Sequence, residues 1–69
     1  MVDRLLRRRE VEEITGVSRS AIYRLMHNGE FPRPVRVGTA AVRWRASDIA
    51  AWLESRPLST GDFGPPDAA

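Results

Sequence analysis

Hydrophobic residues in the first half of the chain recur at the spacing of short amphipathic helices. Val11 and Ile14, three positions apart, predict a helix over residues 8–15 with an apolar edge. The preceding residues, 1–6, are expected to form a lead-in whose two leucines pack on the core. A second helix is predicted over residues 18–28, because four apolar side chains fall within about 140° of its circumference: Ala21, Ile22, Leu25 and Met26.

Small and polar residues mark the junctions around the second predicted helix. Gly16 permits a tight turn after the first helix, because glycine adopts backbone conformations that other residues avoid. Ser18 is a good N-cap, since its hydroxyl can accept a hydrogen bond from a free backbone N–H of the first turn. Asn28 and Gly29 end the helix in the usual way. Two short helices joined like this are typical of a helix-turn-helix motif.

The middle of the chain alternates apolar residues with arginines. Pro32 and Pro34 exclude a helix just before this stretch and hold the chain extended. The alternation over residues 35–37 and 42–45 predicts two strands with one buried face. Residues 38–41 are the short loop between them. The outward side of the resulting hairpin is expected to carry three arginines: Arg36, Arg43 and Arg45.

A last helix is predicted over residues 48–55. Ser47 is its expected N-cap, and Asp48 lies at the positive end of the helix dipole, where an acidic side chain is favourable. Pro57 ends the helix. Its apolar face consists of Ile49, Trp52 and Leu53. Both tryptophans of the chain are expected to lie in the core, which a small domain needs for sufficient apolar burial.

Length and composition limit the architecture to one small domain. The chain has 69 residues and no cysteine, which excludes a disulfide framework, a cysteine zinc site and a cysteine nucleophile. The predicted fold class is mainly α with a small β-hairpin, a compact winged helix-turn-helix over residues 1–56. A flexible C-terminal tail follows over residues 57–69. No apolar run approaches the ~20 residues of a membrane helix and no signal peptide is evident, so we expect a cytoplasmic protein.

The predicted domain is more basic than the chain as a whole. The formal net charge is +2, but residues 1–56 contain all 11 arginines against seven acidic residues, a net charge of +4. No lysine is present. Arginine is the better side chain for planar, forked recognition of phosphate and guanine.

The outward face of the predicted helix 18–28 carries hydrogen-bond donors and no acid. Arginine reaches guanine O6 and N7 in a fork, and serine and tyrosine hydroxyls donate to phosphates. The alternative is an ordinary solvated surface, which usually mixes the two signs of charge. The face consists of Arg19, Ser20, Tyr23, Arg24 and His27. This inventory favours a double-stranded DNA partner.

The order of elements and two stretches of sequence resemble the AlpA family of phage and prophage regulators, within the wider MerR-like and excisionase-like winged-helix group. The stretches are REVEEITGVSRSAIYRLMHNGEFPRPVRVG, residues 9–38, and VRWRASDIAAWLESR, residues 42–56. The resemblance implies a small transcriptional regulator or an excisionase (a recombination directionality factor), bacterial or phage-encoded and associated with the nucleoid. It also implies that the helix about 18–28 enters the major groove and that the hairpin wing about 35–45 contacts the backbone or minor groove.

The resemblance also assigns DNA contacts by position. The helix contacts would be Arg19, Ser20, Tyr23, Arg24 and His27, and the wing contacts Arg36, Arg43 and Arg45, with Thr39 near the wing tip. A module this small buries only about 600–1,000 Å² on DNA, so further copies are expected to bind cooperatively. An excisionase would also have a phage integrase as partner. The long C-terminal dimerisation helix of the MerR proteins is absent, so no small-molecule effector is expected.

An enzyme is the first rival interpretation. His27 is the single histidine, and the nearest hydroxyl on its helix face, Ser20, lies roughly 10 Å away along the axis, too far for a nucleophile–base pair. Glu12 and Glu13 point about 100° apart on a helix and cannot share a substrate. We therefore expect no catalytic residue, no metal and no cofactor. The second rival is a protein–protein adaptor, a winged helix without DNA binding.

Overall fold

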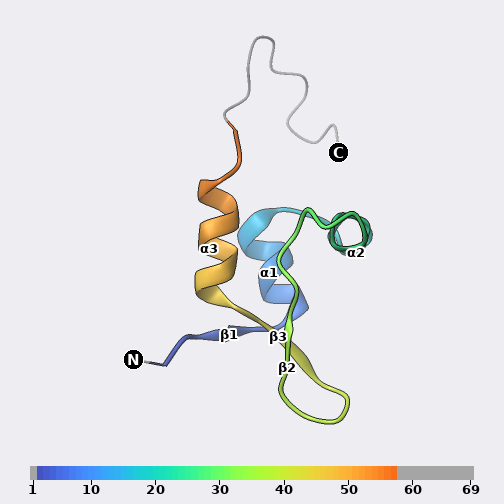
Figure 1. Ribbon diagram of the computed structural model, residues 1–69, viewed down its shortest axis with the longest axis vertical. Helices are drawn as coiled ribbons and strands as arrows, with labels where there is room; N and C mark the ends of the chain where they lie inside the picture. Colours follow the sequence, from blue (N-terminus) through green and yellow to red (C-terminus); the bar gives the residue numbers. More distant parts are fainter. Residues whose placement is uncertain (1, 58–69) are drawn as a thin grey trace.

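The computed structural model describes residues 2–57 as three helices and a small antiparallel sheet (Figure 1). In chain order the elements are β1 (Leu5–Leu6), α1 (Arg8–Thr15), α2 (Arg19–His27), β2 (Val35–Arg36), β3 (Val42–Arg45) and α3 (Ala46–Glu54). In Figure 1, α1 lies between α3 and α2, and the hairpin of β2 and β3 extends below them. This arrangement confirms the predicted fold class, a mainly α, winged-helix-like domain with a β-hairpin.

The first two helices begin and end where the sequence predicted, within one residue. Gly16 closes α1 with a φ of 73°, and its N–H donates to the Glu12 carbonyl at 2.8 Å. Ser18 is the N-cap of α2, and its hydroxyl accepts from the Ala21 N–H at 3.2 Å. Gly29, also at a φ of 73°, follows the end of α2. Local signals therefore define the helix-turn-helix.

The sheet has the order β1-β3-β2, so β3 is its central strand. Leu6 pairs with Trp44 and is buried, whereas Leu5 pairs with Arg45 and is 43% exposed. No pattern in the sequence predicts that the lead-in forms a strand, because two residues are too few to show an alternation. Antiparallel pairing with β3 nevertheless adds these two residues to the sheet, and one of the two predicted leucine anchors reaches the core.

The prediction that the hairpin has one outward side carrying all its arginines is wrong. Directly paired residues of antiparallel strands share a face of the sheet, and successive residues alternate. Arg36 pairs with Val42 and Val35 pairs with Arg43, so Arg36 lies on the face opposite Arg43 and Arg45. Nor is the apolar side fully buried, because Val42 is 42% exposed.

The core is small and draws on every helix. Its buried members are Leu6, Val11, Ile22, Phe31, Trp44 and Ile49. Trp52 packs against this cluster, which confirms the prediction that both tryptophans contribute to the core. Ile14 and Leu53, predicted on apolar helix faces, are 50% and 38% exposed. Six buried side chains do not extend far enough to cover the last turns of α1 and α3.

The N-terminus of α3 differs from the prediction. The helix begins at Ala46, so Ser47 lies in its first turn and is not the cap. The Ser47 N–H and hydroxyl both donate to the carboxylate of Asp3, the N–H at 3.3 Å. The Ala46 N–H donates to the Arg4 carbonyl at 2.8 Å. A segment more than 40 positions away in the sequence therefore caps α3, which no local pattern predicts.

Two further expectations concern membrane-spanning helices and the C-terminal tail. Within residues 2–57, no helix is long and apolar enough to cross a membrane. The predicted tail, 57–69, lies outside the described residues except for Pro57.

Candidate nucleic-acid interface

The outward face of α2 is a continuous polar surface. Ile22 is fully buried and Ala21, Leu25 and Met26 are partly buried, which turns the opposite side of the helix to solvent. All five side chains predicted on that side are exposed: Arg19, Ser20, Tyr23, Arg24 and His27. The helix thus brings together the whole predicted set of helix contacts.

Tyr23 lies near two arginines from different helices, Arg19 on α2 and Arg8 on α1. The guanidinium carbon of Arg19 lies 5.8 Å from the centroid of the Tyr23 ring. Arg8 on α1 pairs with Glu12 at 2.8 Å. The hydrogen bond to Glu12 raises the pKa of Arg8 above its ordinary value, desolvation opposes this rise, and the Tyr23 hydroxyl adds a smaller raising effect. No local pattern in the sequence predicts Arg8 as a neighbour of this face, because only the packing of α1 against α2 brings them together.

Within residues 2–57, the arginines of α2 and of the hairpin form no ion pair. Among residues 2–57 the ion pairs within 4.0 Å are Arg4–Glu10 and Arg8–Glu12, both made with α1 glutamates. Within that part of the chain, Arg19, Arg24 and the hairpin arginines have no carboxylate oxygen at this distance. Their charges are therefore available to an external anion.

The hairpin, here called the wing (residues 35–45), presents its predicted contacts less coherently than α2. Arg36 is exposed on one face, and Arg43 and Arg45 lie on the other. Arg45 is also at the base of the wing, where it immediately precedes α3. Thr39 is exposed in the tip loop, which a hydrogen bond from the Val37 N–H to the Ala41 carbonyl closes at 2.9 Å.

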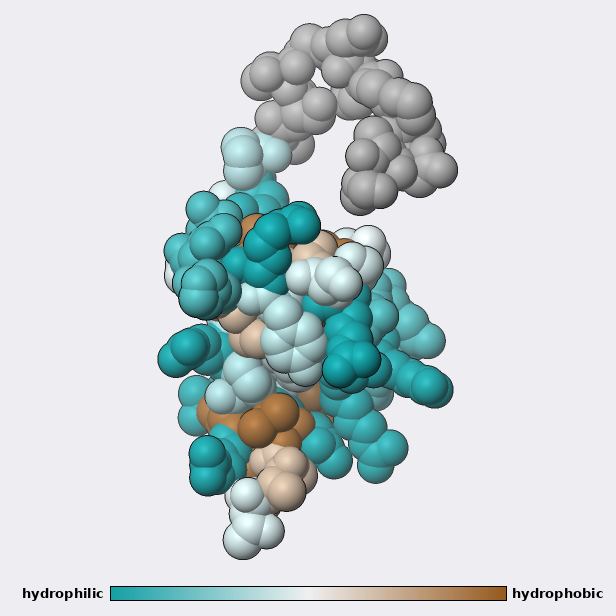
Figure 2. Space-filling model, turned by 90° about the vertical axis from the view of Figure 1, so that its right-hand side faces the viewer, coloured by the Kyte–Doolittle hydropathy of each residue, from teal (hydrophilic) through white to brown (hydrophobic). Residues whose placement is uncertain are grey.

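The wing also exposes apolar surface. Val37 and Val42 are 45% and 42% exposed. Figure 2 shows brown, hydrophobic side chains in the lower part of the molecule, where the wing lies, and mostly teal, hydrophilic ones above them. The wing is therefore a mixed surface of valines and isolated arginines, whereas the outward face of α2 is polar.

A short connecting loop (residues 29–34) joins α2 to the wing and is fixed by both tryptophans. The Trp52 indole N–H donates to the Glu30 carbonyl at 2.8 Å, and the Trp44 indole N–H donates to the Pro32 carbonyl at 2.9 Å. Between these anchors Phe31 is buried and meets the Trp52 ring edge-on, with 4.7 Å between ring centroids. These contacts fix the path of the chain from α2 to the wing.

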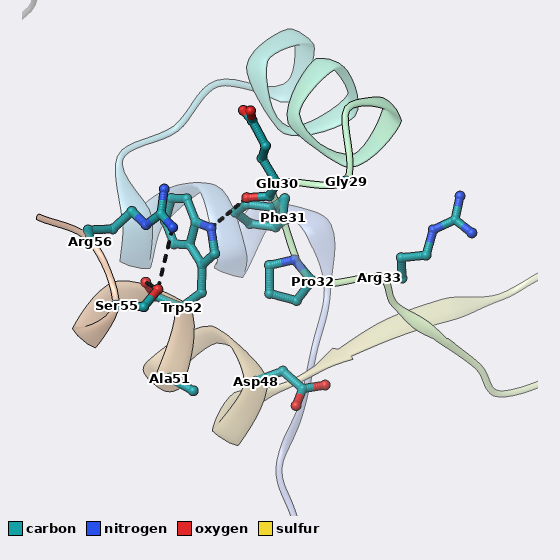
Figure 3. A pocket seen from close by; sticks show the side chains of 10 residues that line it. All are labelled: Gly29, Glu30, Phe31, Pro32, Arg33, Asp48, Ala51, Trp52, Ser55 and Arg56. Carbon is teal, nitrogen blue, oxygen red and sulfur yellow. Dashed lines mark hydrogen bonds between the residues drawn. The ribbon is translucent and has the colours of Figure 1, made fainter.

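An open hollow of about 570 Å³ lies between the connecting loop and α3 (Figure 3). Its apolar part includes Phe31 and Trp52, and Arg56 stacks over the Trp52 ring with 4.8 Å to the centroid. None of the five residues on the outward face of α2 lines this hollow. Among residues 2–57 no group of three histidine or carboxylate side chains is placed to hold a metal ion.

Comparison with known proteins adds to this geometry. A family model described as prophage CP4-57 regulatory protein (AlpA) matches residues 4–57, which include every helix and strand of the structure. The "Uncharacterized protein ORF88" of Enterobacteria phage P4 is 44% identical over 54 residues, covering 78% of this chain and 61% of that protein. The chain thus spans less than two thirds of the length of this relative. No solved structure matches the chain. The family predicted by resemblance is confirmed, and the chain belongs to the AlpA family of prophage regulatory proteins.

Proposed function

We propose that this protein is a sequence-specific double-stranded DNA-binding regulator of the phage or prophage type, acting in the bacterial cytoplasm at the nucleoid. The observation that carries the proposal is the exposed, acid-free face of α2. Arg19, Ser20 and Tyr23 occupy the N-terminal half of the helix, the half that contacts base edges when such a helix enters the major groove. Family membership supports a regulatory role.

In the proposed mechanism the helix reads sequence and the wing holds the backbone. One or two of Arg19, Ser20, Tyr23 and Arg24 contact bases, because forked guanidinium and hydroxyl donors match base edges. Of the wing arginines, Arg36 and Arg43 are the ones nearer the tip, and they supply phosphate contacts that position the protein without reading sequence. The protein acts by binding alone, without catalysis, metal or cofactor.

The proposed function includes two roles that use the same surface. A transcription factor occupies an operator near a promoter, whereas an excisionase binds neighbouring sites near a phage attachment site and acts with an integrase. Because one module buries only about 600–1,000 Å² on DNA, further copies are expected on adjacent sites in either role. The position and clustering of the sites, not the residues, distinguish the roles.

Selection of bound fragments from random and source-genome duplexes tests the proposal, carried out at about 50 and about 200 mM salt. We expect one short motif to be enriched at both salt concentrations, in adjacent copies. Location of the motif beside a promoter supports the transcription factor, and location beside an attachment site supports the excisionase.

Two other outcomes would contradict sequence-specific regulation. Binding without enrichment of any motif indicates a non-specific architectural protein. No binding even at the lower salt concentration indicates the alternative, a protein–protein adaptor that keeps the winged-helix shape without contacting DNA.

A further inference from the structure

The connecting loop carries an arginine that belongs to neither α2 nor the wing. Arg33 is exposed, and among residues 2–57 it has no carboxylate oxygen within 4.0 Å. Arg33 lines the edge of the hollow, and Figure 3 shows its side chain extending from there away from Trp52 and Arg56, on the side where the chain continues into the wing. The guanidinium is therefore presented to solvent between the two elements that are proposed to bind DNA.

The backbone that presents Arg33 is unusually constrained. Pro32 precedes it and Pro34 follows it, so proline rings restrict the backbone on both sides and favour an extended conformation. The carbonyl of Pro32 accepts the Trp44 indole N–H at 2.9 Å, and Trp44 is only 1% exposed. The position of Arg33 relative to the core is thus fixed before any ligand binds, which lowers the entropic cost of a contact.

We propose that Arg33 is a further DNA-binding residue, which contacts a phosphodiester of the backbone between the segments that meet α2 and the wing. This inference rests on the proposed function. A six-residue extended segment spans at most about 20 Å, so Arg33 lies within that distance of the end of α2 at His27 and only two positions from the wing at Val35. A duplex that contacts both α2 and the wing would run alongside the connecting loop, because this loop joins them. A guanidinium forms charge-assisted, often bidentate bonds with phosphate.

The position of Arg33 predicts a contribution to affinity but not to sequence preference. A phosphate contact releases condensed counterions and contributes a slope of about 0.9 to the logarithmic salt dependence of binding. Phosphates are the same in every sequence, so the contact acts equally on specific and unrelated duplexes.

The test compares wild type, Arg33→Ala and Arg56→Ala on one selected duplex and one unrelated duplex, between about 50 and about 200 mM salt. Arg33→Ala is expected to weaken binding to both duplexes by the same factor and to lower the salt slope by about 0.9. When the salt concentration rises from about 50 to about 200 mM, the factor by which Arg33→Ala loses affinity is then about 3.5 times smaller than the factor for wild type. Arg33→Lys keeps the charge and is expected to keep the slope.

Arg56→Ala is the matched control, because it removes the same charge from the opposite side of the loop. Its salt slope is expected to equal that of wild type. If the wild-type protein binds DNA and Arg33→Ala keeps the wild-type salt slope, the Arg33 contact is contradicted but the proposed function is not. A wild-type protein that binds neither duplex contradicts both this contact and the proposed function.

A second variant tests whether the rigid loop matters. Pro34→Ala frees the backbone at Arg33 and is expected to weaken binding about two- to fivefold in a protein that is otherwise folded. In the Arg33→Ala background the same change is expected to have no effect, because no contact remains to be positioned. An equal effect in both backgrounds would assign Pro34 a general structural role and overturn the positioning part of the inference.

Discussion

The outward face of α2 and the wing present their polar residues in two different ways. On α2 one buried residue, Ile22, sets the rotation of the helix, and every predicted contact then shares one exposed side. On the wing, cross-strand pairing puts Arg36 and Arg43 on opposite faces of the hairpin, and Val42 is partly exposed to solvent. A continuous donor surface suits base reading, whereas isolated charges suit phosphates. Under the proposed function, α2 therefore supplies the sequence specificity and the wing supplies the backbone contacts.

The largest effect is expected at the residue that sets the rotation of α2. Ile22 is completely buried, so Ile22→Ala is expected to cost about 2–5 kcal/mol and to unfold much of a domain this small. Ile22→Val is expected to cost about 0.5–1.5 kcal/mol. The control on the wing, Val42→Ala, is expected to change stability by no more than about 0.5 kcal/mol. Urea denaturation followed by tryptophan fluorescence measures all three, and equal losses for Ile22→Val and Val42→Ala would remove the proposed difference between the regions.

A smaller effect is expected at the base of the wing, where Asp3 caps α3. Asp3→Ala leaves the Ser47 N–H and hydroxyl without their acceptor and is expected to cost about 0.5–2 kcal/mol. Asp3→Asn keeps an oxygen acceptor and is expected to lose less. Val2→Ala is a neighbouring control, because Val2 is 94% exposed. The two Asp3 variants are expected to lower the urea midpoint, and Val2→Ala is expected to leave it unchanged. Where folded, all three are expected to bind DNA like wild type; a changed sequence preference in the Asp3 variants would show that the base of the wing also contacts bases.

The smallest effect is expected at the N-terminus of α1. The Arg7 N–H, at 2.9 Å, and next the Arg4 guanidinium lower the pKa of Glu10 below its ordinary value of 4.5. A lowered folded-state pKa contributes stability above the ordinary pKa, and this contribution is lost as the pH falls through the folded-state pKa. The urea midpoints of wild type and Glu10→Gln are thus expected to differ at pH 7 and to converge in acid. Glu13→Gln, on the same helix, is the control, and a difference that persists in acid would contradict the carboxylate interaction.

The sequence predicted the features that depend on neighbours along the chain. The span of α1, the Ser18 cap and the common outward face of α2 follow from residues within four positions of one another. Features that depend on distant partners were missed or wrong. Asp3 meets Ser47 across 44 positions, and the face on which Arg36 lies depends on its register with Val42. The neighbourhood of Arg8 and Tyr23 likewise requires the packing of one helix on another.

The most direct test of the central claim compares Arg19→Ala, Arg24→Ala and Arg36→Ala on the selected duplex and on duplexes with single base-pair changes. We predict that at least one helix variant loses about 1–3 kcal/mol on the selected duplex and no longer discriminates at one position. Arg36→Ala is expected to weaken binding to all duplexes alike and to lower the salt slope by about one. Wild-type affinity and sequence preference in both Arg19→Ala and Arg24→Ala would contradict the assignment of base reading to α2.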